Sequence, residues 1–160
     1  MGKAQSSKGM FNISTRVQYG FLALLALAEG SRSEPVRLNT IAKSLNISFK
    51  YLEHIFKLFT LAGIVSGTRG PEGGYVLKKP PEELSLHAIF TALEGPVFSV
   101  ECFDDESVCD HLAPCPVRDL WKDFSRVLDE FLKARTLKDI KHNHKKSAVQ
   151  AHMQARAGRE

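Results

Sequence analysis

The sequence predicts a mainly α-helical fold that contains one small β-hairpin, an α+β arrangement. Three features of the 160-residue chain support this prediction. Two short helical segments are joined by a tight turn, a glycine-rich hairpin follows the second of them at once, and a long amphipathic helix lies towards the C-terminus. Helix, turn, helix and hairpin in this order form a winged helix-turn-helix, and the late helix adds a surface for dimerisation.

Composition favours a globular protein of the cytoplasm. The hydrophobic content of 43% suits one domain with a real core, and residues 1–9, rich in Gly, Ser and Lys, are expected to form a disordered extension. The N-terminus lacks the apolar core and cleavage site of a signal peptide. The longest apolar run, GFLALLALA at 20–28, is too short to span a membrane. We therefore expect a cytoplasmic protein with no membrane partner.

The first helix is predicted from the segment STRVQYGFLALLALAEG. Thr15 and Gln18 have the spacing of a T-x-x-Q capping box, and Gly30 is expected to end the helix. Apolar residues repeat at helical spacing along one face of this segment, namely Val17, Phe21, Leu24, Leu25 and Ala28.

The helix-turn-helix is expected next. A short helix is predicted over residues 39–45 with Asn39 as its N-cap, and Asn46 starts the tight turn. The following helix begins after Ser48, a second N-cap, and runs to about Ala62. Its buried stripe has the i, i+3, i+4, i+7 pattern and consists of Leu52, Ile55, Phe56 and Phe59.

Two short runs of β type, IVSG at 64–67 and YVLK at 75–78, come directly after this helix. The segment TRGPEGG joins them, and its glycines permit the positive φ angles that a hairpin needs. We therefore assign residues 10–80 to a winged helix-turn-helix that binds DNA.

Residues 81–140 are predicted to hold a cysteine loop and a dimerisation helix. A helix over 85–94 precedes the loop, which is bounded by prolines. Residues 141–160 lack apolar periodicity and are expected to form a flexible basic tail. The long helix after the loop has a broad apolar face that predicts a partner helix, with Val117, Leu120, Trp121, Phe124, Val127, Leu128 and Phe131.

Charge is distributed unevenly along the chain, although the net charge is only +4. Residues 1–79 carry 11 Lys and Arg against 4 Asp and Glu, residues 80–140 carry 6 against 13, and residues 141–160 carry 5 against 1. A basic first half indicates a polyanionic partner such as nucleic acid, whereas an acidic centre would repel one.

The exposed face of the second helix of the pair suits the major groove of DNA. Arg69, in the glycine-rich hairpin loop, is expected to reach a neighbouring groove or phosphate. On an isolated helix such a face would be an ordinary solvated surface, but its place before a hairpin in a basic half-chain favours DNA binding. The face carries basic and hydrogen-bonding groups, namely Ser48, Lys50, Tyr51, His54 and Lys57.

All three cysteines of the chain, Cys102, Cys109 and Cys115, lie in one acidic loop with the spacing C-x6-C-x5-C. Three thiolates this close can converge on one site, and thiolates favour zinc or the iron of an iron-sulfur cluster. Neither gap matches the short C-x2-4-C pairs of structural zinc sites. The acidic residues of the loop disfavour the thiolates that metal-free redox chemistry requires. An iron-sulfur cluster is the best single answer, with zinc, redox thiols and inert cysteines as alternatives.

The stretch ISFKYLEHIFKLFTLAGIVSGTRGPEGGYVL, followed by a glycine-proline, the three-cysteine loop and PVRDLW, strongly resembles the Rrf-two family of bacterial transcription regulators. The resemblance covers residues 11–140. It implies a dimeric winged-helix repressor or activator with an iron-sulfur cluster, in which Arg69 and Pro71 approach the minor groove. The residues that match the family's recognition-helix contacts are Ser48, Lys50, Tyr51 and Glu53.

A cluster normally has four protein ligands, and the loop offers three cysteines. In some related regulators the fourth ligand is a histidine three residues after the last cysteine, but this chain has Arg118 at that position. In another relative it is an acidic residue from the first helix of the partner subunit, and the aligned residue here is Gln18. Candidates here are His111, Asp110, Gln18 of the other chain, or a small exogenous ligand. A 2Fe-2S cluster is the first choice, and three cysteines can also hold a 4Fe-4S cluster.

We hypothesise that gain, loss or nitrosylation of the cluster shifts the spacing of two recognition helices on a pseudo-palindromic double-stranded DNA operator. Such a homodimer would sense iron, oxygen, redox state or nitric oxide. One alternative is a metal-free regulator that responds to a metabolite or to thiol oxidation. Another, from a different class, is an iron-sulfur electron-transfer or assembly protein. The sequence contains no nucleophile elbow, phosphate loop or zinc-protease motif, so an enzyme is not expected.

Overall fold

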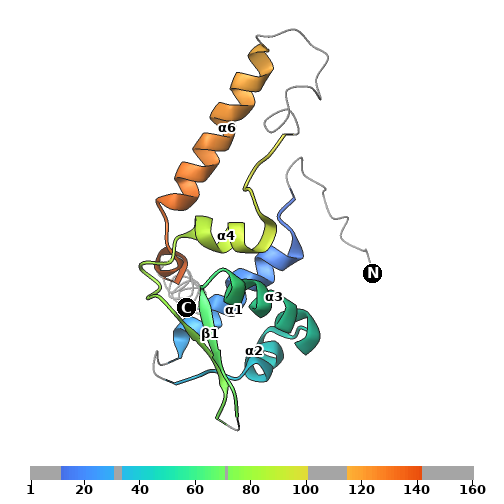
Figure 1. Cartoon of the computed structure of the whole chain (residues 1–160), viewed down its shortest axis with the longest axis vertical. Coiled ribbons are helices and arrows are strands. Elements are labelled where there is room, and N and C mark those ends of the chain that lie inside the picture. The colour runs from blue at the N-terminus through green and yellow to red at the C-terminus, as the bar shows by residue number, and fades with distance from the viewer. Residues whose placement is uncertain (1–11, 31–33, 71, 101–114, 142–160) are drawn as a thin grey trace, which may run out of the picture.

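The computed structural model describes residues 12–30, 34–70, 72–100 and 115–141. Helices α1 to α4 and one antiparallel hairpin form a single body, and α6 projects away from it (Figure 1). The predicted mainly α-helical fold with a small hairpin is confirmed. The elements are α1 (Thr15–Glu29), α2 (Leu38–Leu45), α3 (Phe49–Leu61), β1 (Val65–Thr68), β2 (Gly74–Leu77), α4 (Leu86–Glu94) and α6 (Pro116–Lys133).

The N-cap of helix α1 lies one residue before the predicted cap, Thr15. Ser14 is the N-cap, and its hydroxyl accepts a hydrogen bond from the backbone N–H of Val17 at 3.2 Å. The predicted capping box of Thr15 and Gln18 is therefore wrong: Gln18 donates instead to the carbonyl of Ile13, at 3.1 Å. The predicted end is confirmed, with Gly30 as the C-cap.

Helices α2 and α3 form the helix-turn-helix. The prediction of Asn39 as a cap is wrong, because α2 starts at the buried Leu38 and Asn39 already lies in its first turn. Asn46 ends α2 in the left-handed conformation, with φ 52° and ψ 46°, as the predicted tight turn requires. Ser48 caps α3 through a hydrogen bond from the N–H of Tyr51 at 3.2 Å.

The hairpin that follows α3 consists of β1 and β2, each four residues long. Val65 pairs with Leu77 and Thr68 pairs with Gly74, so the connection spans residues 69–73. Its predicted strands differ from the observed ones by one residue. Gly63, with φ +69°, makes the bend between α3 and the hairpin.

The core is formed by apolar side chains of α1 to α4, the start of β1 and one residue after α6. Within the described residues no polar side chain is buried. Each large apolar side chain that is fully buried contributes about 1.5–3 kcal/mol. The largest of them are Phe56, Phe59, Leu24, Ile41, Leu52, Ile55, Ile89, Leu137 and Val65, and they include all four residues of the predicted α3 stripe.

After α6 the chain returns to the body. Thr136 forms an antiparallel bridge with Ser85, and the N–H of Leu137 donates to the carbonyl of Leu84 at 2.9 Å. Residues 137–141 are helical, and the ammonium group of Lys141 donates to the carbonyl of Ala28 at 2.8 Å. The C-terminal end of α6 is thereby connected to the body that holds the helix-turn-helix.

Several predictions concern residues that lie outside the described ones. These are the N-terminal extension at 1–9, most of the cysteine loop with Cys102, Cys109, Asp110 and His111, Pro71 of the hairpin loop, and the tail after Lys141. In the part of the chain that the structure does describe, no helix has the length and apolar character needed to cross a bilayer.

Candidate nucleic-acid interface

The outward face of α3 carries the predicted DNA contacts. Its inward face is held by the four fully buried residues of the α3 stripe, which fixes the orientation of the helix on the body. The opposite face is therefore turned to solvent. The side chains that are exposed on it are Ser48, Lys50, Glu53, His54 and Lys57.

Tyr51 differs from its neighbours because it is half-buried. Its ring lies edge-on to Tyr19 of α1, with centroids 6.2 Å apart and planes at 86°. Such a pair adds about 0.5–1.5 kcal/mol beyond the area it buries. Tyr51 therefore attaches the start of α3 to α1 and also contributes to the candidate DNA face.

The wing is the hairpin of β1 and β2, and it stands beside α3. Phe56 of α3 packs edge-on against Tyr75 of β2, with centroids 4.8 Å apart. Arg69 follows β1 and is exposed, in agreement with its predicted place in the hairpin loop. Within the loop, the N–H of Gly73 donates to the carbonyl of Gly70 at 2.9 Å, and Gly70 has φ +107°.

A groove of about 440 Å³ lies between the start of α2, helix α3 and the wing; we call it the wing groove. It brings two of the predicted residues together, since Glu53 from α3 and Arg69 from the wing both line it. It is also lined by Arg37 and Asn39, neither of which was predicted from the sequence as a DNA contact. The sequence marks Arg37 only as a basic residue directly before a helix. Basic residues are common at solvated helix ends, so this position alone did not indicate a DNA contact.

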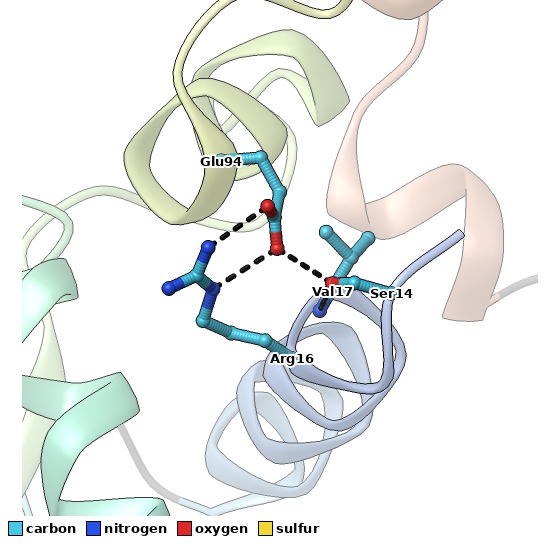
Figure 2. Close-up of polar contacts among 4 residues, drawn as sticks. All are labelled: Ser14, Arg16, Val17 and Glu94. Carbon is cyan, nitrogen blue, oxygen red and sulfur yellow. Dashed lines mark hydrogen bonds and ion pairs between the residues drawn. The ribbon is translucent and has the colours of Figure 1, made fainter. Parts of the chain in front are cut away.

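A cluster of hydrogen bonds joins the start of α1 to the end of α4 (Figure 2). The guanidinium group of Arg16 donates to both carboxylate oxygens of Glu94, at 3.0 and 2.8 Å, and the hydroxyl of Ser14 donates to one of them at 2.5 Å. The bonds from Arg16 and Ser14 lower the pKa of the Glu94 carboxyl, and the bond to Glu94 raises the pKa of Arg16. The cluster fixes the last residue of α4, directly before the segment that leads to the cysteines.

Cys115 is the one predicted metal ligand of the loop that lies in the described part of the chain. It is the N-cap of α6 and is half-buried, and its side chain makes no capping hydrogen bond. The positive end of the α6 dipole favours negative charge at this position, as carried by a thiolate or an anionic cluster. Among the described residues there is no group of three or more His, Cys, Asp and Glu side chains arranged to hold a metal ion.

The apolar face of α6 divides into two parts. Trp121 and Phe124 pack against Phe98, with ring centroids 6.1 and 5.2 Å apart, so the segment before the cysteine loop covers this side. Four other apolar side chains of the helix are more than half exposed, namely Val117, Leu120, Val127 and Phe131. We call these four residues the α6 stripe.

An apolar cavity of about 640 Å³ lies at the base of α6, between α6, α4 and the start of α1. Gln18, the candidate ligand from the first helix, is among the residues that line it. Phe131 of the α6 stripe lines it as well, so the cavity and the stripe are continuous.

The fold agrees with comparisons to known proteins. The family model of Rrf2, described as an iron-dependent transcriptional regulator, matches residues 13–143. The chain belongs to the Rrf2 family. The sequence-based resemblance is thereby confirmed, and the family model and the relatives named below describe transcription regulators.

Relatives within the Rrf2 family include regulators with different names. The regulator IscR of Serratia proteamaculans is 33% identical over 131 residues, which are 82% of this chain and 79% of that protein. The structure of CymR, the global cysteine regulator of Bacillus subtilis, matches with a TM-score of 0.68 and 34% identity, over 82% of this chain and 96% of that chain. The oxidized form of Staphylococcus aureus CymR matches with a TM-score of 0.62 and 32% identity, over 80% and 94%.

Proposed function

We propose that this Rrf2-family chain is a homodimeric regulator that binds a pseudo-palindromic DNA operator and that its affinity is set by an iron-sulfur cluster on its three cysteines. The observation that carries the DNA-binding part is the exposed polar face of α3 beside the wing. A helix of this kind fits the major groove, and a wing on its flank reaches the adjacent backbone or minor groove.

The residues of the interface have different roles in this proposal. Lys50 and His54 of α3 face base edges, and Lys57 contacts phosphate. Arg69 and Pro71 of the wing approach the minor groove. Further contacts come from Ser48 and Tyr51, and Glu53 accepts from a cytosine amino group or excludes other bases.

The α6 stripe supports the homodimer. Its four side chains are apolar, more than half exposed and repeated along one helix. A second copy that covers them would remove this apolar surface from water, which is favourable. The cavity at the base of α6 continues this surface towards α1. A symmetric pair would present two α3 helices and two wings to the two halves of one operator.

The cluster would be held by Cys102, Cys109 and Cys115. Three thiolates form a suitable donor set for iron-sulfur iron, and Cys115 lies where a helix dipole favours an anionic group. The description of the family as iron-dependent supports the same assignment. A bound cluster would supply an iron centre that reacts with oxygen or nitric oxide. The fourth ligand would be His111, Asp110, Gln18 of the partner chain or an exogenous molecule.

A second candidate is metal-free thiol sensing by the same fold. It is favoured by the similarity to CymR of Bacillus subtilis, a global cysteine regulator, and to the oxidized form of CymR of Staphylococcus aureus. In this alternative, two of the three thiols give up two electrons and two protons to an oxidant and form a disulfide. The same loop would then change shape without iron.

DNA binding is tested by selecting duplexes from a random-sequence library with the purified full chain, followed by fluorescence anisotropy. We expect Lys50→Ala and Arg69→Ala to weaken binding to the selected duplex by about 1–3 kcal/mol each. Lys122→Ala removes a cation from the exposed side of α6 away from the α6 stripe and serves as the matched control. Failure to select any duplex would contradict the proposal.

The cluster is tested on anaerobically purified protein by visible absorption and by counts of iron and sulfide. The variant with all three cysteines changed to alanine should lose all three signals and keep its helical circular dichroism. Its DNA affinity should no longer depend on reconstitution. A colourless wild-type protein whose thiols become a disulfide in air, with a loss of two mass units, would favour metal-free sensing instead.

A further inference from the structure

The wing is connected to the start of α2 by backbone hydrogen bonds. The N–H of Val36 donates to the carbonyl of Tyr75 at 3.0 Å, and the N–H of Tyr75 donates to the carbonyl of Val36 at 2.9 Å. The two backbones approach so closely that a Cβ atom on Gly74 would lie 2.5 Å from the carbonyl oxygen of Val36. These contacts hold the wing against the segment that leads into α2.

Arg37 follows this connection directly and projects into the wing groove. It is the N-cap residue of α2, where the positive end of the helix dipole adds to its charge. Its guanidinium group lies 3.7 Å from the carboxylate of Glu72 in the hairpin loop. The side chains of Arg37 and Glu72 are 60% and 97% exposed, so both are open to solvent, and Arg37 also lines the groove.

The position of Glu72 is unfavourable for a DNA-binding wing unless the carboxylate has a specific role. Phosphates carry negative charge along the whole duplex, and a carboxylate beside them is repelled. Arg37 can form a bidentate contact with either anion, since carboxylate and phosphate oxygens have similar spacing. Glu72 and a DNA phosphate are therefore alternative partners of the same guanidinium group.

We propose that Arg37 is a phosphate contact and that Glu72 is its intramolecular competitor, which holds Arg37 in the free protein and releases it when DNA enters the wing groove. This inference rests on the proposed DNA binding by α3 and the wing. Its consequence is that Glu72 lowers the affinity for every DNA sequence alike, because a phosphate contact carries no sequence information. The ratio between operator and non-operator binding is unchanged.

The test is a double-mutant cycle on the full chain with Glu72→Gln, Arg37→Gln and both together. Binding is measured by fluorescence anisotropy with the selected duplex and with one unrelated duplex, over a range of salt concentrations. Glu82→Gln, which removes the same charge in the turn between β2 and α4, is the matched control. Arg37→Lys keeps the charge without the bidentate geometry.

We expect Glu72→Gln to tighten binding to both duplexes by about twofold to fivefold, the scale of an exposed ion pair. Arg37→Gln should weaken binding and reduce the slope of log affinity against log salt by about 0.9, the value for one phosphate contact. In the double variant the gain from Glu72→Gln should disappear, because the competitor has nothing to hold. Arg37→Lys should lie between wild type and Arg37→Gln.

Two outcomes would overturn this inference while DNA binding stands. If Glu72→Gln tightened binding equally with and without Arg37, Glu72 would act on DNA directly. If Glu72→Gln weakened binding, the ion pair would be a latch that organises the wing. A wild-type protein that bound neither duplex would instead refute the proposed function itself.

Discussion

At the residue scale, the pKa of Glu94 links the Arg16–Glu94 contact to pH. The carboxyl accepts hydrogen bonds from Arg16 and Ser14, and these hold its pKa below the ordinary value of 4.5. A carboxyl whose pKa is depressed on folding contributes stability above the unfolded-state pKa. This contribution is lost as the pH falls through the lower, folded-state pKa.

We therefore predict that Glu94→Gln lowers the free energy of unfolding at neutral pH by about 1 kcal/mol, a modest value because the Arg16 and Glu94 side chains are 35% and 26% exposed. The difference from wild type should shrink as the pH falls below 4.5. Urea unfolding at neutral and acidic pH measures it. An equal loss in Glu82→Gln would show that general charge balance, rather than this contact, is responsible.

At the element scale, the short segment after α6 returns the chain to the core. Thr136 bridges Ser85, and Leu137 is fully buried among the side chains of the body. Lys141 adds a hydrogen bond to the C-terminal turn of α1. The segment therefore fixes the C-terminal end of α6, just as the Arg16–Glu94 contact fixes the end of α4.

We predict that Leu137→Ala destabilises the fold by about 2–5 kcal/mol. The truncation leaves a cavity in the core that the surrounding side chains can fill only in part. Thermal and urea unfolding measure the loss. Leu61→Ala is the matched control, since Leu61 is 77% exposed and should change stability by no more than about 0.5 kcal/mol. Similar losses in the two variants would contradict the role of the return segment.

At the scale of the whole molecule, the α6 stripe and the charge distribution favour a dimer with its basic halves on DNA. Helix α6 extends away from the body (Figure 1), and its stripe leaves four apolar side chains in water. The acidic residues concentrate between residues 80 and 140, apart from the basic first half that holds α3 and the wing. Dimerisation through α6 would cover the stripe and keep the acidic part away from the phosphates.

We predict that Val127→Glu converts the dimer into a monomer, because pairing would bury an unpaired charge at the centre of the interface. Analytical ultracentrifugation measures the change, and operator affinity should fall with it, since one protomer contacts only half a site. Lys122→Glu also places a carboxylate on α6, but on a side of the helix away from the stripe, and should leave the dimer intact. A monomeric Val127→Glu protein with unchanged operator affinity would contradict the two-half-site arrangement.

The sequence by itself determined which segments form helices and strands, and it determined the inward face of α3. In α1, only Val17 and Leu24 of the predicted apolar face are buried. The apolar spacing in α3 predicted the four residues that are fully buried. Ser48 and Asn46 marked helix ends because hydroxyl caps and left-handed turns are local properties. The cysteine spacing and the motifs that carry the family resemblance are local patterns of the same kind. These signals need no knowledge of distant contacts.

Only the tertiary structure decided which residues meet across the chain. The cap of α1 is Ser14 rather than Thr15, and Glu94, 80 residues away in sequence, accepts from the same hydroxyl. Val36, two residues before α2, pairs with Tyr75, and the next residue, Arg37, lies near Glu72. Leu137 is buried because the chain after α6 folds back on Leu84. Such contacts depend on packing between elements, and no spacing within one segment encodes them.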